Sequence, residues 1–208
     1  MYTQRIIHFP AVGKGPDLRA ALEERNNDAN AAAPHSLSSR MFSLEPAFVH
    51  SIRFDNLAAI ETYQGRNPGP AFQATGVKIN QCLSRERATE LHETLVPAQV
   101  AGTPKYSLRI THFPAPGKGP ELRGLLEERV SKTVRGRLGA GLSTQVAPPD
   151  GPAFVVTQLF SGMAGMDEAR AANQEDPSFQ AWAKKVAALA ARPPQQEMLR
   201  ILAPFPAR

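Results

Sequence analysis

The amino-acid sequence predicts an α+β fold in which two β-α-β-β-α-β repeats pack their antiparallel sheets into a single intrachain α/β-barrel. Three observations predict it. The chain contains an internal repeat, each repeat has this order of elements, and one predicted strand in each repeat is apolar on both faces. A length of 208 residues and a hydrophobic content of 42% suit two small domains with a sizeable core.

The internal repeat is visible when the sequence is compared with itself. Tyr2–Ala11 returns as Tyr106–Ala115, at an offset of 104 residues. The offset has grown to 107 by Phe72 and Phe179, in steps that fall between predicted elements. Insertions confined to loops leave a fold intact, so the pattern indicates a tandem duplication.

The duplication also gives the expected domain boundaries. We expect a first repeat over residues 1–97, a linker over 98–104 and a second repeat over 105–208. The linker contains proline and glycine and has no hydrophobic periodicity, as is typical of a connection between domains.

Each element of the first repeat has its own sequence signal. Gly15-Pro16-Asp17 opens a helix with proline in its first turn, and Asp55 is the expected N-cap of a second helical region. The predicted elements are strand 2–9, a helix from residue 15, strands 36–44 and 47–54, a helical region after Asp55 that breaks at Asn67-Pro68-Gly69, and strand 89–96.

The second repeat carries the same signals in the same order. Its helical region is expected to begin after Ser161 and to stop at Pro193-Pro194. The predicted elements are a first strand containing Arg109, a helix from residue 119, strands 142–147 and 153–160, a helical region that breaks at Glu175-Asp176-Pro177, and strand 196–202.

Two of the predicted strands, one in each repeat, indicate how the repeats combine. Ala47–Phe54 and Ala153–Phe160 have no clean polar face. An antiparallel sheet with helices on one side ordinarily shows a polar face to water on the other. We therefore expect the sheet of each repeat to be covered by the sheet of the other, which closes a barrel with helices outside.

The element order resembles the ferredoxin-like repeat of the dimeric α/β-barrel superfamily, here fused in tandem. Tyr106-Ser107-Leu108-Arg109, followed by Pro116-Gly117-Lys118 and a helix with Glu121-Leu122, is similar to the opening of NIPSNAP-type domains. The first repeat departs from that motif at Gln4 and Val12. The superfamily includes cofactor-independent monooxygenases, isomerases, haem enzymes and proteins without a known reaction, so the resemblance implies a fold and leaves the chemistry open.

Arg5 and Arg109 are candidate site residues because they lie mid-strand in a strand expected to be buried on both faces. An arginine beneath the helices would need several partners in an apolar layer. We therefore place both in the barrel lumen, where a carboxylate or an anionic substrate could meet them. Glu93 and Glu197 are the candidate partners, and a purely structural ion pair is the alternative.

Four histidines are candidate general bases, because an imidazole titrates near neutrality. His8 and His112 end the first strand of each repeat, and the alternative is that each only hydrogen-bonds the adjacent loop. His35, His50 and His92 occur in the first repeat alone, so a site that uses them would be one-sided. The second repeat has Val156 and Leu199 at the positions of His50 and His92, and a gap opposite His35.

No metal or cofactor is expected. The histidines are not paired at metal-ligand spacing, and no Cys-x-x-Cys or phosphate-loop motif occurs. Haem-binding members of the superfamily resemble one another in an axial histidine on a helix, whereas His112, the histidine of the second repeat, is predicted on a strand. The lone Cys82 reads as a small buried hydrophobe and cannot form an internal disulfide, which favours a reducing cytoplasm.

Charge and hydropathy exclude two classes of partner. The net charge is +5 without a basic run typical of nucleic-acid binding, and no stretch of 18 apolar residues predicts a membrane span. A small-molecule ligand is the expected partner, and self-association is left open.

Two functions from different classes follow. The first is a cofactor-independent enzyme, monooxygenase- or isomerase-like, that binds or transforms a small apolar or aromatic molecule in the barrel lumen. The second is a non-catalytic NIPSNAP-like ligand-binding or scaffold protein. A titratable pair facing one cavity would distinguish them, and whether the chain is an enzyme stays open at this stage.

Overall fold

The computed structural model describes residues 1–29, 33–66, 69–148 and 151–205. The chain divides into two compact units, Met1–His92 with Arg200–Arg208, and Glu93–Leu199. Each unit holds most of one sequence repeat. The elements of the first repeat are β1 (Tyr2–His8), α1 (Gly15–Ala29), β2 (His35–Met41), β3 (Phe48–Phe54), α2 (Leu57–Gly65), α3 (Pro70–Gln81) and β4 (Ala88–Val96).

The second repeat has the same order of elements. They are β5 (Tyr106–His112), α4 (Gly119–Ser131), β6 (Gly139–Gln145), β7 (Phe154–Phe160), α5 (Met163–Glu175), α6 (Pro177–Leu189) and β8 (Gln195–Ala203). The predicted β-α-β-β-α-β order is therefore confirmed in both repeats, with each second helical region split into two helices.

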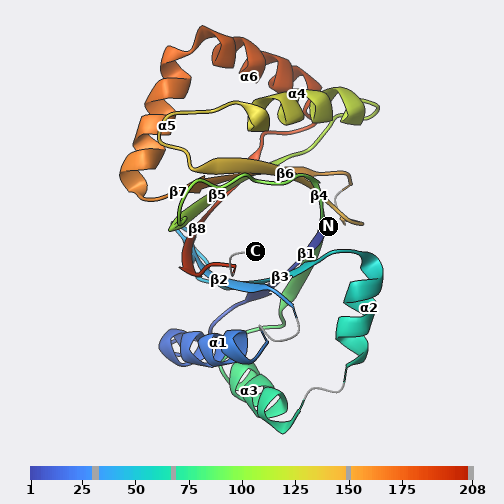
Figure 1. Cartoon of the computed structure of the whole chain (residues 1–208), viewed down its shortest axis with the longest axis vertical. Coiled ribbons are helices and arrows are strands. Elements are labelled where there is room, and N and C mark those ends of the chain that lie inside the picture. The colour runs from blue at the N-terminus through green and yellow to red at the C-terminus, as the bar shows by residue number, and fades with distance from the viewer. Residues whose placement is uncertain (30–32, 67–68, 149–150, 206–208) are drawn as a thin grey trace. The chain divides into compact units, whose positions relative to one another are not determined.

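The strands form one closed antiparallel barrel, which confirms the predicted fold class (Figure 1). Their hydrogen-bonded order is β1-β3-β2-β8-β5-β7-β6-β4. The first strand of each repeat is flanked by strands on both sides, as the sequence predicts, and this position explains why Arg5 and Arg109 are both buried.

In the first unit, α1 and α3 pack side by side against the sheet (Figure 1). Leu18 and Leu22 of α1 are fully buried against Leu37 of β2 and Ile79 of α3. Cys82 belongs to the same cluster, which confirms its expected role as a small buried side chain. A second cluster joins α2 to β3 through Ile60, Ile52 and Phe54.

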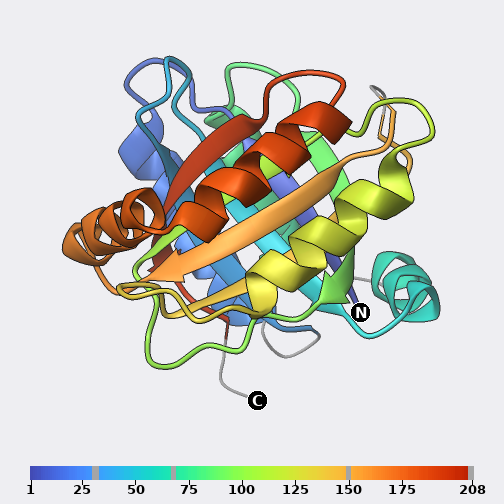
Figure 2. The same ribbon diagram turned by 90° about the horizontal axis from the view of Figure 1, so that it is seen from above.

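In the second unit, α4 and α6 cover the corresponding part of the sheet (Figure 2). Leu122 and Leu126 of α4 are fully buried against Leu142 and Val156. The indole N–H of Trp182 donates to the Leu125 carbonyl at 2.9 Å, so this aromatic side chain serves helix packing.

The strand-to-helix turn before the first helix depends on glycine in both repeats. Gly13 and Gly117 each have φ of +76°, a left-handed conformation that other residues adopt at a cost. The neighbouring Lys14 and Lys118 are exposed and pair with Asp17 and Glu121 of the following helix.

The predicted helix starts are displaced by one residue. Asn56, not Asp55, caps α2, and its side-chain oxygen accepts from the Ala59 amide at 2.8 Å. Gly162, not Ser161, precedes α5 and makes no side-chain cap. The predicted break at Asn67-Pro68 lies outside the described residues, but α2 ends at Gly65 and α3 begins at Pro70.

Among the described residues, no helix combines the length and the apolar character that crossing a bilayer requires.

Candidate functional site

Strand β1 separates two groups of candidate residues. Ile6 lies directly opposite His50 in β3, and His50 lies opposite Leu37 in β2, so these side chains share one face of the sheet. Leu37 packs against α1, which identifies this face as the one covered by the helices. Because side chains alternate along a strand, His8 lies on the helix-covered face and Arg5 on the other.

Three histidines gather on the helix-covered face of the first unit, and we call His8, His35 and His50 the histidine cluster. All three are at most 2% exposed. His35 Nδ1 lies 2.7 Å from His50 Nε2, so one ring donates a hydrogen bond to the other. Their rings also stack, with centroids 4.7 Å apart, and the ring of Tyr63 in α2 lies 6.0 Å from His35.

Burial keeps the histidine cluster uncharged. Desolvation is the largest cause that lowers the pKa of His8 to about 3 and that of His35 to about 4. The pKa of His50 lies well below its usual value for the same reason. The guanidinium of Arg25 lowers all three pKa values further, since it disfavours a second positive charge nearby.

The opposite face of the first unit holds a different group. Arg5 is 5% exposed and donates to the Glu90 carboxylate of β4, forming an ion pair. His92, two residues further along β4, places Nε2 3.1 Å from the same Glu90 oxygen. Glu90 thus joins Arg5 and His92, while His8 and His50 lie on the other side of the sheet.

The second unit carries only part of this arrangement. Arg109 donates to Glu197 of β8 at 2.8 Å, which places the predicted partner Glu197 as expected. His112 is buried on the helix-covered face, and desolvation lowers its pKa to about 4. No second histidine of the described residues accompanies it, because the chain's other four histidines all belong to the first repeat.

Equivalent strand positions show what replaces the histidine cluster in the second repeat. Val156 stands at the position of His50, opposite Ile110 as His50 is opposite Ile6. Ala140, opposite Gln158, corresponds to His35, opposite Ile52. Ala140 and Val156 belong to a buried apolar cluster, so the second repeat packs where the first repeat presents imidazoles.

Sequence reasoning missed several residues of these two groups. It offered Glu93 as the partner of Arg5, whereas the structure pairs Arg5 with Glu90. The offset of 107 that aligns His92 with Leu199 also aligns Glu90 with Glu197, so a signal was present. Tyr63 and Arg25 had no comparable signal, because only tertiary packing brings them to the histidines.

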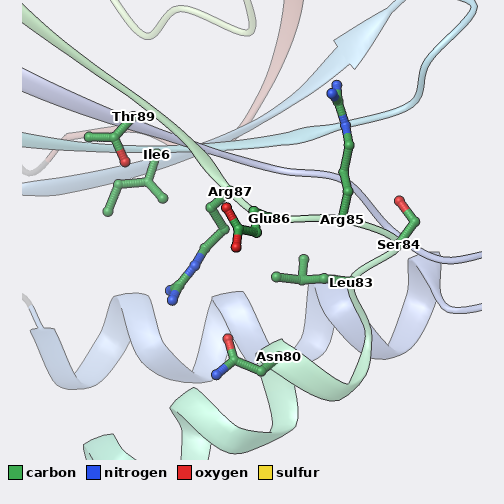
Figure 3. Close-up of a pocket in the computed structure, with 8 residues that line it drawn as sticks. All are labelled: Ile6, Asn80, Leu83, Ser84, Arg85, Glu86, Arg87 and Thr89. Carbon is green, nitrogen blue, oxygen red and sulfur yellow. The ribbon is translucent and has the colours of Figure 1, made fainter.

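A cavity of about 610 Å3 opens beside the histidine cluster, where the segment between α3 and β4 passes β1 (Figure 3). Ile6 lines it from β1, on the same face as His8. The guanidinium of Arg87, another lining residue, acts on the pKa of His8. The lining residues are Ile6, Asn80, Leu83, Ser84, Arg85, Glu86, Arg87 and Thr89.

The histidines do not fit the role of a haem ligand. All five lie in strands and are between 0% and 6% exposed, and none lines the described cavity. The haem-binding members that the sequence resembles carry their axial histidine on a helix, a position that no histidine of this chain occupies. Within the described residues there is also no group of three or more histidine, cysteine or acidic side chains arranged for a metal ion.

Comparison with known proteins identifies the fold. No family model matches this sequence, and no curated protein matches it either. A proposed monooxygenase from Fusobacterium nucleatum superposes with a TM-score of 0.77 at 9% identity, covering 100% of this chain and 97% of that one. A proposed monooxygenase from Lactobacillus acidophilus gives 0.68 at 9% identity, covering 99% of both chains.

A third structure, of an anthrone oxidase-like protein, gives a TM-score of 0.66 at 12% identity and covers 100% of this chain and 94% of that one. Identities this low demonstrate a shared fold and nothing about the reaction. The similarity runs over both repeats. The chain therefore has the fold of the dimeric α/β-barrel superfamily, as a duplicated barrel within one polypeptide.

Proposed function

We propose that this protein is a cofactor-independent enzyme, monooxygenase- or isomerase-like, that acts on a small aromatic molecule beneath the helices of its first repeat. The observation that carries the proposal is the histidine cluster. The fold does not require imidazoles at these positions, because the second repeat has Ala140 and Val156 there in a buried apolar cluster. Burying two imidazoles, those of His35 and His50, in place of apolar side chains costs stability, and catalysis is a reason to retain them.

The chemistry that suits these residues is proton removal from a weakly acidic C–H or O–H group. A neutral imidazole accepts the proton, and its partner imidazole holds it in a fixed orientation through the 2.7 Å contact between His35 and His50. The phenol of Tyr63 lies near enough to the cluster to donate a hydrogen bond to the resulting oxyanion.

The similar structures favour an oxidation as the next step. An anthrone supplies the simplest example, because its carbanion can itself reduce oxygen. The CH2 group loses two protons and four electrons, one oxygen atom becomes the new carbonyl, and the other leaves as water. The products, anthraquinone and water, balance without a flavin or a metal.

Oxygen consumption with anthrone, in the absence of any added cofactor, tests the proposal. His50→Val installs the residue of the second repeat, and we expect it to lower kcat/KM by about 100-fold or more. His92→Ala tests the other one-sided histidine on the same assay. His112→Ala is the matched control from the second repeat and should have a much smaller effect. Equal losses in His50→Val and His112→Ala would reject the one-sided site.

In this proposal the Arg5–Glu90 and Arg109–Glu197 pairs hold strands together. The pair recurs in the second repeat, where the histidine cluster is absent, which supports a structural role. Arg5 and Arg109 nevertheless stay candidates for binding an anion or enolate.

A second candidate function is a NIPSNAP-like ligand-binding or scaffold protein without catalysis. The Tyr106-Ser107-Leu108-Arg109 opening of β5 favours it, as does the recurrence of the same arginine–carboxylate pair in both repeats. A panel of phenols, quinols and lactones separates the two functions. Ligands that raise Tm without turnover support the second, and turnover supports the first.

A further inference from the structure

We infer that the cavity beside the histidine cluster binds a monoanionic carboxylate, and that Arg25 and Arg87 recognise it. The inference rests on the proposed function of this site and deepens it by naming the substrate class: an aromatic molecule that carries a carboxylate. Three observations in the first unit carry it, and each concerns a different group.

The first observation is an excess of positive charge around the cavity. Arg87 lines the cavity. Its charge and that of Arg66, the C-cap residue of α2, both act on Arg25 of α1, which lies behind the lining residues. Tyr63 is the remaining group that acts on Arg25, so no carboxylate of the described residues compensates it. Desolvation nevertheless lowers the pKa of Arg25, which means that its charge is partly buried.

The second repeat shows how such an arginine is ordinarily satisfied. Arg129 occupies the position of Arg25, and its guanidinium lies 3.7 Å from the Asp176 carboxylate and donates to Asn173. The position of Asp176 corresponds to Gly69 in the first repeat. The first repeat has therefore replaced the internal counterion by a glycine while keeping the arginine.

The second observation is an unsatisfied polar side chain. His8 is 1% exposed, and neither of its ring nitrogens has a hydrogen-bond partner among the described residues. Leaving a buried polar group unpaired is costly, so a ligand or an ordered water is expected there. The charges of Arg87 and Arg25 both act on His8, so the unsatisfied ring lies within electrostatic range of the same two arginines.

The third observation is the direction of the lining side chains. Figure 3 shows Arg87 extending from its strand toward the helices, while Arg85 points the opposite way. The guanidinium of Arg85 forms an ion pair with the Glu45 carboxylate at 2.7 Å. Arg87 is therefore the arginine of this segment that faces the helices. Asn80 approaches from α3 and offers an amide to the same space.

Charge and shape limit the ligand class. Glu86 is the carboxylate among the lining residues, and it disfavours a dianion such as hydrogen phosphate. Arginine donates two parallel N–H groups that match the two oxygens of a carboxylate. Ile6 and Leu83, the apolar lining residues, provide surface for an aromatic body.

Binding of benzoate to the full-length protein, measured by titration calorimetry, tests the inference. Benzamide is the neutral probe of the same shape, and inorganic phosphate is the competing anion. We expect benzoate to bind, and Arg87→Met to weaken its binding about tenfold or more. Arg25→Lys, which keeps the charge but not the paired donors, should weaken it as well and avoids the risk that Arg25→Met fails to fold.

Arg19→Met is the matched control. Arg19 lies in α1 like Arg25, but it is exposed and pairs with Glu23 at 2.8 Å. Its loss lowers the net charge equally and should leave benzoate affinity unchanged. The inference is overturned if benzoate does not bind, if Arg87→Met binds it as well as the native protein, or if benzamide binds equally. Tighter arginine-dependent binding of phosphate would overturn the carboxylate assignment.

The outcomes also separate this inference from the proposed function. Oxidation of the neutral substrate anthrone without arginine-dependent benzoate binding would leave the enzyme and remove the carboxylate site. Arginine-dependent benzoate binding without turnover of any substrate would leave the site and remove the enzyme.

Discussion

At the scale of single residues, the buried arginines make the clearest test of stability. The side chains of Arg109 and Glu197 are 10% and 18% exposed. Arg109→Met keeps the bulk but leaves the carboxylate without its guanidinium, so we expect a loss of about 1–3 kcal/mol in the free energy of unfolding in urea. Arg123→Met breaks an exposed helical pair with Glu127 and should cost no more than about 0.5 kcal/mol.

The same substitutions decide whether these arginines serve a ligand. If Arg5→Met or Arg109→Met folds normally and loses the binding of a phenol, quinol or lactone from the ligand panel, the arginine binds that ligand. If the variant is destabilised and binds the same ligand with native affinity when folded, the arginine is structural. Equal stability of Arg109→Met and Arg123→Met would contradict the buried ion pair as a source of stability.

The buried histidines predict acid sensitivity. The pKa of His112 is lowered to about 4 in the folded protein, against 6.5 when exposed. The unfolded chain therefore takes up a proton first as the pH falls, and folding is weakened between about pH 6.5 and pH 4. In that range, each such histidine lowers the free energy of unfolding by up to about 1.4 kcal/mol for every pH unit of acidification.

His112→Leu tests this effect with one histidine. Urea unfolding at pH 4.5, 5.5 and 6.5 should show a shallower loss of stability for the variant than for the native protein. Histidines of the first repeat, including His8 with a pKa of about 3, keep part of the slope in both proteins. An identical slope in the two proteins would show that His112 is not held neutral by the fold.

Sequence reasoning at this scale succeeded where alternation along a strand decides the outcome. Alternation along β1 placed Arg5 and His8 on opposite faces, as observed. It could not find Tyr63, because a tyrosine in a helix with an ordinary polar pattern gives no sign of which strand it will meet. The proximity of Tyr63 to His35 depends on how α2 packs, and packing is not encoded in local spacing.

At the scale of elements, the duplicated helix starts offer a paired experiment on capping. Asn56 caps α2 with its side chain, whereas Gly162 precedes α5 without one. Asn56→Ala should lower the free energy of unfolding by about 1 kcal/mol, because the Ala59 amide loses its acceptor. Gly162→Asn should raise the free energy of unfolding by about 0.3 kcal/mol.

The position of Gly162 permits this substitution. Its φ of −170° is extended backbone that any residue adopts, and an added Cβ would meet nothing within 4 Å. Urea unfolding measures both variants. A loss of stability in Gly162→Asn would contradict the assignment of Gly162 as the N-cap.

The order of elements was predictable because each element has a sequence signal in both repeats, so that each assignment has two independent supports. A break such as Asp176-Pro177 is informative on its own, since proline begins α6 and Asp176 caps it. The exact starts were less predictable. Asp55 and Asn56 are both good N-caps, and their choice depends on where β3 stops pairing with β1.

At the scale of the whole molecule, duplication explains why one repeat can hold a site and the other can pack. Both copies keep the arginine–carboxylate pair and the glycine turn, which serve the fold. Among the described residues, the first repeat adds His35 and His50 to the buried histidine that both repeats share, and the second pairs its α-helical arginine with Asp176. In the proposed function, divergence of this kind places the reaction in one repeat while the other maintains stability.

The double variant His35→Ala/His50→Val tests this division of roles directly. It gives the first repeat the two residues that the second repeat carries at the same positions, Ala140 and Val156. Replacing both partners of a buried hydrogen bond by compatible apolar groups is close to neutral, whereas removing one partner leaves the other unsatisfied. We therefore expect the double variant to be at least as stable as His50→Val, by calorimetric Tm, and to lose turnover about 100-fold or more.

The reverse substitution, Val156→His, should lower Tm by burying an unpaired imidazole among Leu142 and Leu126, and should add no activity. A double variant that retains native turnover would show that the histidine cluster is packing in both repeats, and the reaction would then have to be sought on the other face of the sheet, with Arg5, Glu90 and His92.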